Sequence, residues 1–176
     1  MRLVLALAYA RMGDIREAQE MADILNQEAP LDTLVQNYDL PTIRAAMELY
    51  KGDPGGAVEL LRSSEKYDLA YPNGFNSLYP VYIRGLALLQ LGEGRDAAAE
   101  FQKMLDHPGI VQDEVTGALS HLQLARAEKM MGNAVAARKS YEDFLSLWKD
   151  ADSNIPIYQK AKAEYALLRK NSNRVP

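Results

Sequence analysis

The stretch from Leu91 to Phe101, LGEGRDAAAEF, contains a pattern that occurs four times along the chain. A glycine is followed five residues later by an alanine, and another apolar or aromatic residue follows four positions after that. The glycines, separated by 39, 40 and 40 residues, are Gly13, Gly52, Gly92 and Gly132. Their alanines are Ala18, Ala57, Ala97 and Ala137, and the third positions are Ala22, Leu61, Phe101 and Tyr141. A fixed period of this size is typical of stacked helical hairpins.

Each glycine lies between two stretches with helical patterning, so we expect a turn at the glycine that joins two antiparallel helices. The predicted pairs are 2–12 with 14–28, 41–51 with 54–67, 79–91 with 94–105, and 114–131 with 133–149, and a last helix covers 157–170. Nearly all prolines fall between these helices or at their starts. No stretch alternates polar and apolar residues as a strand would, so the predicted fold class is all-α.

Small residues also occur seven positions before each turn glycine, at Ala6, Ala45, Gly85 and Ala125. Glycine inside a helix costs about 1 kcal/mol relative to alanine. We therefore infer that the partner helix approaches Gly85 so closely that no side chain fits there. The alanine that follows each turn is expected to make the matching contact from the second helix.

The amino-acid composition of the chain argues against several classes of function. The 176 residues, close to the size of one domain, include 20 Lys and Arg against 24 Asp and Glu, a net charge of −4. Nucleic-acid binding usually requires a basic face, and no such cluster is present. The chain has no cysteine, which excludes disulfides and thiolate metal sites. The apolar run 3–10 after Arg2 could begin a signal peptide, but it is too short to span a bilayer and fits the first predicted helix better.

The spacing of small and aromatic positions resembles the tetratricopeptide repeat. Departures occur at Arg44 and Arg84, where the family usually has leucine, and at Glu48 and Glu128, where it usually has tyrosine. The resemblance implies an α-solenoid of four antiparallel helix pairs in a right-handed superhelix with a C-terminal capping helix. The single array would cover 1–170, with repeats at about 1–30, 39–69, 78–109 and 114–149, a capping helix at 157–170 and a polar tail at 171–176.

Two stretches of the sequence resemble a narrower group of proteins within this family. Residues 97–107, AAAEFQKMLDH, and 141–152, YEDFLSLWKDAD, are similar to the C-terminal repeat region of bacterial eukaryote-like Ser/Thr protein kinases. The kinase motifs themselves are absent, including the glycine-rich phosphate loop, His-Arg-Asp and Asp-Phe-Gly. We therefore expect no enzyme activity in this segment, and a kinase parent would have its catalytic domain upstream. A start inside a predicted helix also favours the repeat part of a longer protein.

The resemblance also implies a concave peptide-binding face on the first helix of each pair. Its candidate residues are Leu3, Leu7, Thr42, Ala46, Leu49, Tyr82, Leu86, Leu89, Leu122, Arg126 and Lys129. This face is mostly apolar and becomes basic in the fourth pair, so we expect it to bind an apolar or mildly acidic protein segment. The lysine and asparagine with which some members of the family bind a terminal carboxylate are absent. Alternatively, several of these residues pack between repeats.

The remaining candidates are aromatic residues and histidines. Five aromatic residues span the longest predicted loop: Tyr67, Tyr71, Phe75, Tyr79 and Tyr82. They either contact a partner or, as we favour, fill the space between the second and third pairs. His107 and His121, the two histidines, are interpreted as structural because a zinc site needs three or four ligands. The sequence predicts no catalytic residue, no metal site and no cofactor.

The leading hypothesis from sequence is therefore a non-catalytic scaffold for a protein or peptide partner, within a larger bacterial signalling protein. It neither binds nucleic acid nor inserts into a membrane. The alternatives are a module that self-associates as a homo-oligomer or packs on another domain of its parent, and the sensor part of a transcription regulator with the same repeats. The protein would be cytoplasmic, or extracytoplasmic if the parent has a membrane span before the repeats.

Overall fold

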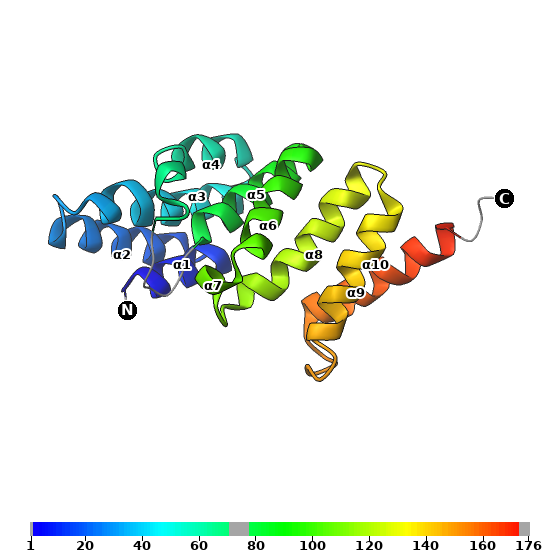
Figure 1. The fold of residues 1–176 in the computed structure, drawn as a ribbon. Helices are drawn as coiled ribbons and strands as arrows, with labels where there is room; N and C mark the ends of the chain where they lie inside the picture. The colour runs from blue at the N-terminus through cyan, green and yellow to red at the C-terminus, as the bar shows by residue number, and fades with distance from the viewer. Residues whose placement is uncertain (1, 71–77, 173–176) are drawn as a thin grey trace.

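The computed structural model describes residues 2–70 and 78–172, which form helices and connecting turns without a strand (Figure 1). The ten α-helices are α1 (Arg2–Met12), α2 (Ile15–Glu28), α3 (Leu40–Lys51), α4 (Pro54–Leu61), α5 (Tyr79–Leu91), α6 (Gly94–Asp106), α7 (Pro108–Val111), α8 (Val115–Met130), α9 (Ala134–Leu147) and α10 (Pro156–Ser172). A π-helix at Val35–Asp39 leads into α3, and a 3-10 helix covers Glu65–Tyr67. The prediction of an all-α fold is confirmed.

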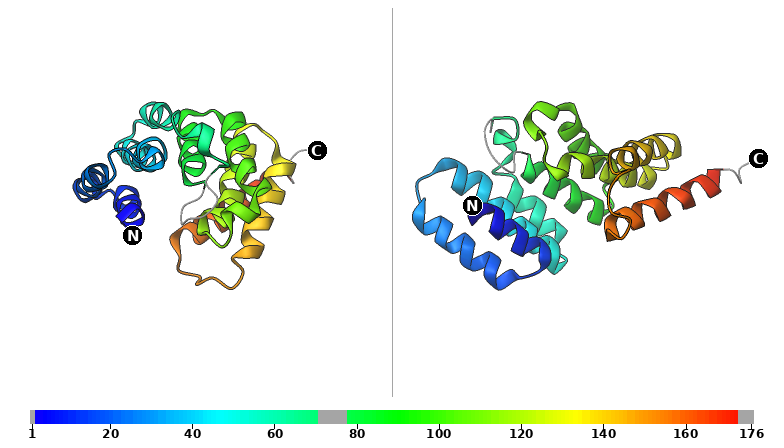
Figure 2. Two further views of the ribbon diagram at one scale, coloured as in Figure 1. Left: turned by 60° about the vertical axis from the view of Figure 1, so that its left-hand side comes forward. Right: turned by 90° about the horizontal axis from the view of Figure 1, so that it is seen from below.

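Consecutive helices pack in pairs, α1 with α2, α3 with α4, α5 with α6, and α8 with α9. The first helix of each later pair contacts both helices of the pair before it: α3 contacts α1 and α2, α5 contacts α3 and α4, and α8 contacts α5 and α6. The last helix, α10, packs on α9. Pairs that are neighbours in sequence are thus neighbours in space, and they follow a curved path from α1 to α10 (Figure 2).

One turn geometry joins the helices of all four pairs. The turn glycines have φ values of 90°, 84°, 81° and 80°, in the left-handed region that glycine adopts without steric cost. The residue after each glycine donates its N–H to the carbonyl five positions earlier, at 2.9 Å in every pair. These bonds run from Asp14 to Tyr9, Asp53 to Glu48, Glu93 to Leu88 and Asn133 to Glu128. This pattern satisfies carbonyls at the helix end, which explains why glycine recurs there.

The small residues of the repeat lie where helices of a pair meet. Ala18, Ala57, Ala97 and Ala137 are fully buried, as are Ala6, Ala45 and Ala125. Gly85 on α5 faces the fully buried ring of Phe101 on α6, and a β-carbon at Gly85 would lie 2.6 Å from Cζ of that ring. The close approach inferred from sequence is confirmed, and its cause is the phenylalanine on the partner helix.

The buried side chains form two hydrophobic clusters. The larger one joins α1 to α7 and includes Leu124 and Ala127 of α8. The smaller one lies between α8, α9 and α10 and consists of Leu122, Ala125, Ala137, Tyr141, Phe144, Tyr158, Ala161 and Leu168. α8 therefore contributes different buried side chains to the two clusters, and its partly buried Leu119 packs against both.

The predicted helix at 54–67 is wrong, because α4 ends at Leu61. The hydroxyl of Ser64 donates to the carbonyl of Leu61 at 2.7 Å, and such local side-chain bonds compete with helical backbone bonds. The π-helix before α3 and the short helix α7, placed in a predicted turn, were also not predicted. Within the described ranges, no helix has both the length and the apolar character needed to cross a membrane.

Candidate functional site

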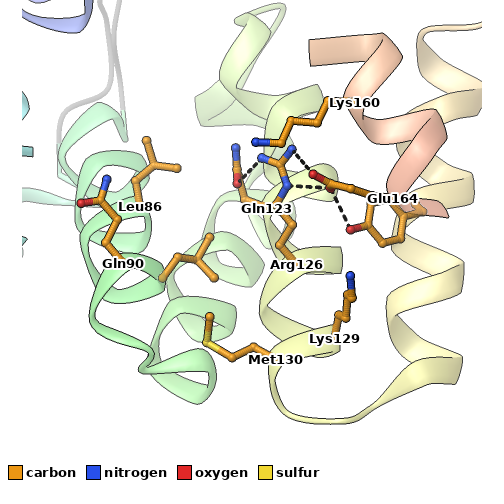
Figure 3. Close-up of a pocket in the computed structure, with 10 residues that line it drawn as sticks. Leu86, Gln90, Gln123, Arg126, Lys129, Met130, Lys160 and Glu164 are labelled. Atoms are coloured by element: carbon orange, nitrogen blue, oxygen red, sulfur yellow. Dashed lines mark hydrogen bonds and ion pairs between the residues drawn. The ribbon is translucent and has the colours of Figure 1, made fainter. Parts of the chain in front are cut away.

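A pocket of about 680 Å³ opens between α5, α8 and α10, and Figure 3 shows its lining. One wall is largely apolar and the other is charged. The residues that line it are Leu86, Leu89 and Gln90 of α5, Gln123, Arg126, Lys129 and Met130 of α8, Tyr141 of α9, and Lys160 and Glu164 of α10. Helices from the last two pairs and from the end of the chain thus meet at a single hollow.

The charged wall is organised around Arg126. Its Nε donates to Oε2 of Glu164 at 2.9 Å and its Nη2 to Oε1 at 3.1 Å, so the pair is bidentate. Its Nη1 donates to Oε1 of Gln123 at 3.1 Å. The phenol of Tyr141 donates to Oε2 of Glu164 at 3.0 Å. Three donors on α8 and α9 therefore hold one carboxylate of α10 (Figure 3).

Burial and charge act in opposite directions on this carboxylate. Burial raises the pKa of Glu164, but the hydrogen bonds and charge of Arg126, the bond from Tyr141 and the charge of Lys160 outweigh it and lower the pKa. The pKa of Tyr141 is raised by burial and by the adjacent Glu164. Both groups are therefore held in one state near neutral pH, Glu164 ionised and Tyr141 protonated.

The pocket has more cations than anions. Arg126, Lys129 and Lys160 line it together with a single carboxylate, that of Glu164. Lys129 and Lys160 are exposed, and neither forms a salt bridge with another described residue. An anionic group that enters the pocket would meet two ammonium groups as well as the apolar surface of α5.

Polar contacts continue from the pocket towards the start of the chain. Nε2 of Gln123 donates to the hydroxyl of Tyr82 at 3.4 Å. The guanidinium of Arg11 on α1 lies 5.7 Å from the centre of the Tyr82 ring, a cation–π distance. Together with the bonds of Arg126, these contacts connect α1, α5, α8 and α10.

A second arginine cluster lies apart from this pocket, and its arginine is buried. Nη2 of Arg84 lies 2.6 Å from both Oδ2 of Asp68 and Oε2 of Glu100, and the Arg84 and Asp68 side chains are each 5% exposed. Lys103 reaches the same two carboxylates at 3.1 and 3.5 Å. Burial lowers the pKa of Arg84, but the two carboxylates outweigh it and raise the pKa. Arg84 thus has two carboxylate partners of its own, one of which, Asp68, is buried.

The predicted concave-face residues divide into three groups. Leu86, Leu89, Arg126 and Lys129 line the pocket. Leu3 and Leu49 are half-buried and lie outside it. The remaining five are buried and cannot present their side chains to a ligand: Leu7, Thr42, Ala46, Tyr82 and Leu122. For these five the alternative of packing between helices is correct, because neighbouring helices cover them.

Among the aromatic series, Tyr71 and Phe75 lie outside the described residues. Tyr82 is buried, and its ring contacts that of Phe101 edge to face at 5.9 Å, whereas Tyr67 and Tyr79 are half-buried. Tyr82 therefore packs between α5 and α6, the two helices of the third pair, and the interpretation that this series fills the space between the second and third pairs stays a prediction.

The histidines have separate structural contacts. Nδ1 of His107 lies 2.8 Å from the carbonyl oxygen of Lys103, to which it can donate a hydrogen bond. His121 lies 4.0 Å from Asp143, and burial lowers its pKa despite that carboxylate. Across residues 2–70 and 78–172, no three His, Asp or Glu side chains are grouped to hold a metal ion.

Sequence reasoning missed Gln123, Lys160 and Glu164 as pocket residues. The sequence placed Lys160 on the polar outer face of a capping helix, and nothing in the local pattern distinguishes Glu164 from a solvated glutamate. The missing information is how α10 is rotated about its axis. Ala161, Tyr165 and Leu168 fix that rotation: Ala161 and Leu168 are buried, and the hydroxyl of Tyr165 donates to Glu142 of α9.

Comparisons with known protein families, curated proteins and solved structures find no match to the chain. What the pocket can bind therefore has to follow from the chemistry of its own residues.

Proposed function

We propose that the chain is a non-catalytic protein–protein interaction scaffold of the tetratricopeptide kind, a right-handed α-solenoid of four helix pairs with α10 as its capping helix. Support comes from four identical glycine turns, from buried alanines at equivalent positions, and from the contacts of each pair with the pair before it. Arrays of this type bind partners on their inner surface.

The observation that carries this proposal is the pocket between α5, α8 and α10. Leu86, Leu89 and Met130 offer apolar surface, while Lys129 and Lys160 offer positive charge without salt-bridge partners among the described residues. A partner segment with apolar and acidic side chains complements both walls. Apolar contact supplies affinity, and opposite charge supplies orientation and a faster association rate.

A peptide-display experiment tests this function and needs no identified partner. Random twelve-residue peptides are selected on the whole chain, and the binders are counted for leucine-like and acidic residues. We expect both classes to be enriched together. Recovered peptides of neutral or basic composition would contradict the proposed ligand.

A matched pair of variants then locates the binding site. Arg126→Glu with Lys129→Glu reverses two charges in the pocket and should weaken the selected peptides by at least tenfold, about 1.4 kcal/mol. Arg95→Glu with Lys149→Glu makes the same change in net charge at exposed positions outside it. Equal losses in the two variants would show that only net charge matters.

We further propose that the parent is a larger bacterial signalling protein, with this chain as its regulatory or partner-recruiting region. The support is the similarity of 97–107 and 141–152 to the repeat regions of bacterial Ser/Thr kinases. The coding sequence upstream tests it directly, since a kinase parent requires a catalytic domain there.

One observation favours a second function. Val4 and Leu5 on α1 are 44% and 43% exposed, which leaves an apolar face without a covering helix among the described residues. This face could pack against a second copy or against another domain. Light scattering over a concentration series distinguishes the cases. Self-association requires a molecular mass that rises with concentration, and the variant Val4→Glu with Leu5→Lys should then have the mass of the monomer.

A further inference from the structure

The charged wall of the pocket already contains a bound carboxylate, that of Glu164. Two N–H groups of Arg126 and the hydroxyl of Tyr141 converge on its two oxygens at 2.9 to 3.1 Å. Charge-assisted and bidentate bonds of this kind are the strongest that a protein offers to a carboxylate. We call these three donors the carboxylate cradle.

The donors and the carboxylate come from different parts of the chain. Arg126 and Tyr141 lie on α8 and α9, which form one helix pair, whereas Glu164 lies on the last helix. α10 packs on α9, and several of its side chains remain exposed, among them Leu167 at 57%. The cradle therefore belongs to the body of the fold, and its occupant belongs to a terminal helix with a solvent-exposed side.

Because the cradle is partly buried, leaving it empty costs free energy, whereas replacing Glu164 by another carboxylate costs little. The side chains of Arg126 and Glu164 are 23% and 19% exposed, so removing one partner would leave the other partly desolvated without its counter-charge. Replacing Glu164 by another carboxylate keeps the same three hydrogen bonds. The free energy of an exchange then depends on the new contacts that the incoming chain makes with the pocket.

The pocket offers such contacts next to the cradle. Leu86 lies across from Arg126 (Figure 3), and Leu89 also lines the pocket. Lys129 and Lys160 supply positive charge that Glu164 does not neutralise. An incoming acidic residue with apolar neighbours would gain both. Glu164 alone makes use of the cradle but not of the apolar wall.

We infer that Glu164 is an internal substitute for a partner's acidic side chain, and that binding moves this residue out of the cradle. This inference rests on the proposed function, because it identifies the group by which the partner is anchored. Glu164 would then limit affinity in the free chain, and its displacement from the cradle would report that the site is filled.

Acetate tests the cradle directly. Glu164→Ala removes a CH₂–carboxylate fragment that acetate matches in size and charge, so acetate should bind in its place. We expect the Tm of this variant to be about 3 °C higher in acetate, at about ten times its Kd, than in chloride of equal ionic strength. The wild-type Tm should be equal in the two salts.

Two controls make the result specific. Glu142 lies on α9, in the same helix pair as the cradle but outside the pocket, and its exposed carboxylate accepts a hydrogen bond from Tyr165. Glu142→Ala removes this carboxylate, and its Tm should be equal in acetate and chloride. Arg126→Leu added to Glu164→Ala should abolish the effect. An equal Tm of Glu164→Ala in acetate and chloride would overturn the inference.

A second measurement covers the case in which Glu164→Ala fails to fold. Glu164→Gln keeps the length of the side chain but loses its charge, and should bind the display-selected peptides roughly tenfold more tightly than the wild type. The peptides are amidated at the C-terminus, so that the bound carboxylate comes from a side chain. Unchanged or weaker binding, or binding that requires a free C-terminus, would overturn the inference.

The two proposals fail in different ways. If peptides bind the wild type but acetate and Glu164→Gln have no effect, the function stands and the exchange is wrong. If acetate stabilises Glu164→Ala but no peptide binds any variant, the cradle admits carboxylates and the proposed function is wrong.

Discussion

The two arginine clusters of this protein use the same chemistry in opposite settings. Arg84 and its two carboxylates, which we call the closed cluster, have side chains 5% to 15% exposed, and the partly exposed Lys103 balances the second negative charge. Arg126 and Glu164 lie at the edge of a pocket that contains two further ammonium groups. In the charge-balanced cluster the ion pairs of the buried Arg84 fix helices relative to one another, and only Asp68 and Lys103 line an adjoining hollow. A cluster with excess charge and an open side can also bind.

The closed cluster also has a larger desolvation cost. Oδ1 of Asp68 and Nη1 of Arg84 are buried and have no hydrogen-bond partner among the described residues. Such groups destabilise the folded state unless their neighbours compensate. The cluster holds the segment after α4 against α5 and α6. Loss of one of its charged partners should therefore lower the stability of the fold strongly.

The largest effect should come from breaking the closed cluster. Arg84→Leu leaves the carboxylates of Asp68 and Glu100 buried with only Lys103 as a counter-charge, and should lower the free energy of unfolding by about 3–5 kcal/mol. Urea denaturation followed by circular dichroism measures it. The triple variant that adds Asp68→Asn and Glu100→Gln should recover most of the loss. A loss of about 2 kcal/mol or less for the single variant would place the cluster in the same class as the open one.

The second largest effect is expected at the contact between α5 and α6 that lies next to the closed cluster. Gly85, adjacent to Arg84, contacts the ring of Phe101, adjacent to Glu100. Gly85→Leu should push α5 from α6 and cost about 3 kcal/mol, the upper part of the range for overpacking. Combining it with Phe101→Ala should cost less than the sum of the single changes, because the smaller residue makes room. Additive losses would show that the two positions do not share this contact.

Asp39 is a buried carboxylate that forms no salt bridge with another described residue. It adds to the comparison a third kind of site, a buried carboxylate without a counter-charge. Burial, and to a lesser degree Asp32, raises its pKa to about 6, against 3.8 for an unperturbed group. Since the folded state then holds the proton more tightly than the unfolded state, stability should fall as the pH rises from about 4 to about 6. Asp39→Asn should remove this dependence and raise stability at pH 7 by about 1–3 kcal/mol.

Urea denaturation of wild type and Asp39→Asn across this pH range measures the difference. The two proteins should be similar below pH 4 and should diverge as the pH rises. A constant difference at all pH values would mean that Asp39 ionises normally in the folded state.

The smallest effect on stability is expected at the open cluster. Arg126→Leu should cost about 1–2 kcal/mol at pH 7, because water can partly solvate the Glu164 carboxylate once its partner is lost. The lowered pKa of Glu164 gives the wild type an advantage above the unfolded pKa of about 4.5, which is lost as Glu164 protonates at lower pH. Thermal melts at pH 7 and in acid measure it. A loss equal to that of Arg84→Leu would remove the distinction between the clusters.

The repeated pattern predicted most of the fold because each of its positions has a local physical cause. Gly13 and its three equivalents are required by a left-handed turn, and Gly85 by a ring on the next helix. The π-helix before α3 and the early end of α4 depend on local hydrogen bonds, such as that of Ser64, which leave no periodic signal.

The site was predicted only in part, since Arg126 and Lys129 were identified but Glu164, the partner of Arg126, was not. Residues within one helix can be placed on a face by periodicity. The meeting of Arg126 with Glu164, 38 positions later, depends on how α10 docks on α9. Burial of Leu7, Thr42, Ala46, Tyr82 and Leu122 likewise depends on how neighbouring helices pack against them.

The division of α8 between two hydrophobic clusters also has a consequence for cooperativity. Leu124 and Ala127 belong to the larger cluster, while Leu122 and Ala125 belong to the one shared with α9 and α10. A C-terminal unit can therefore unfold locally while the first three pairs keep their core. Amide hydrogen exchange should then report two free energies of opening, lower in α9 and α10 than in α5 and α6. Because the pocket lies at this boundary, a bound partner would slow exchange on the C-terminal side most.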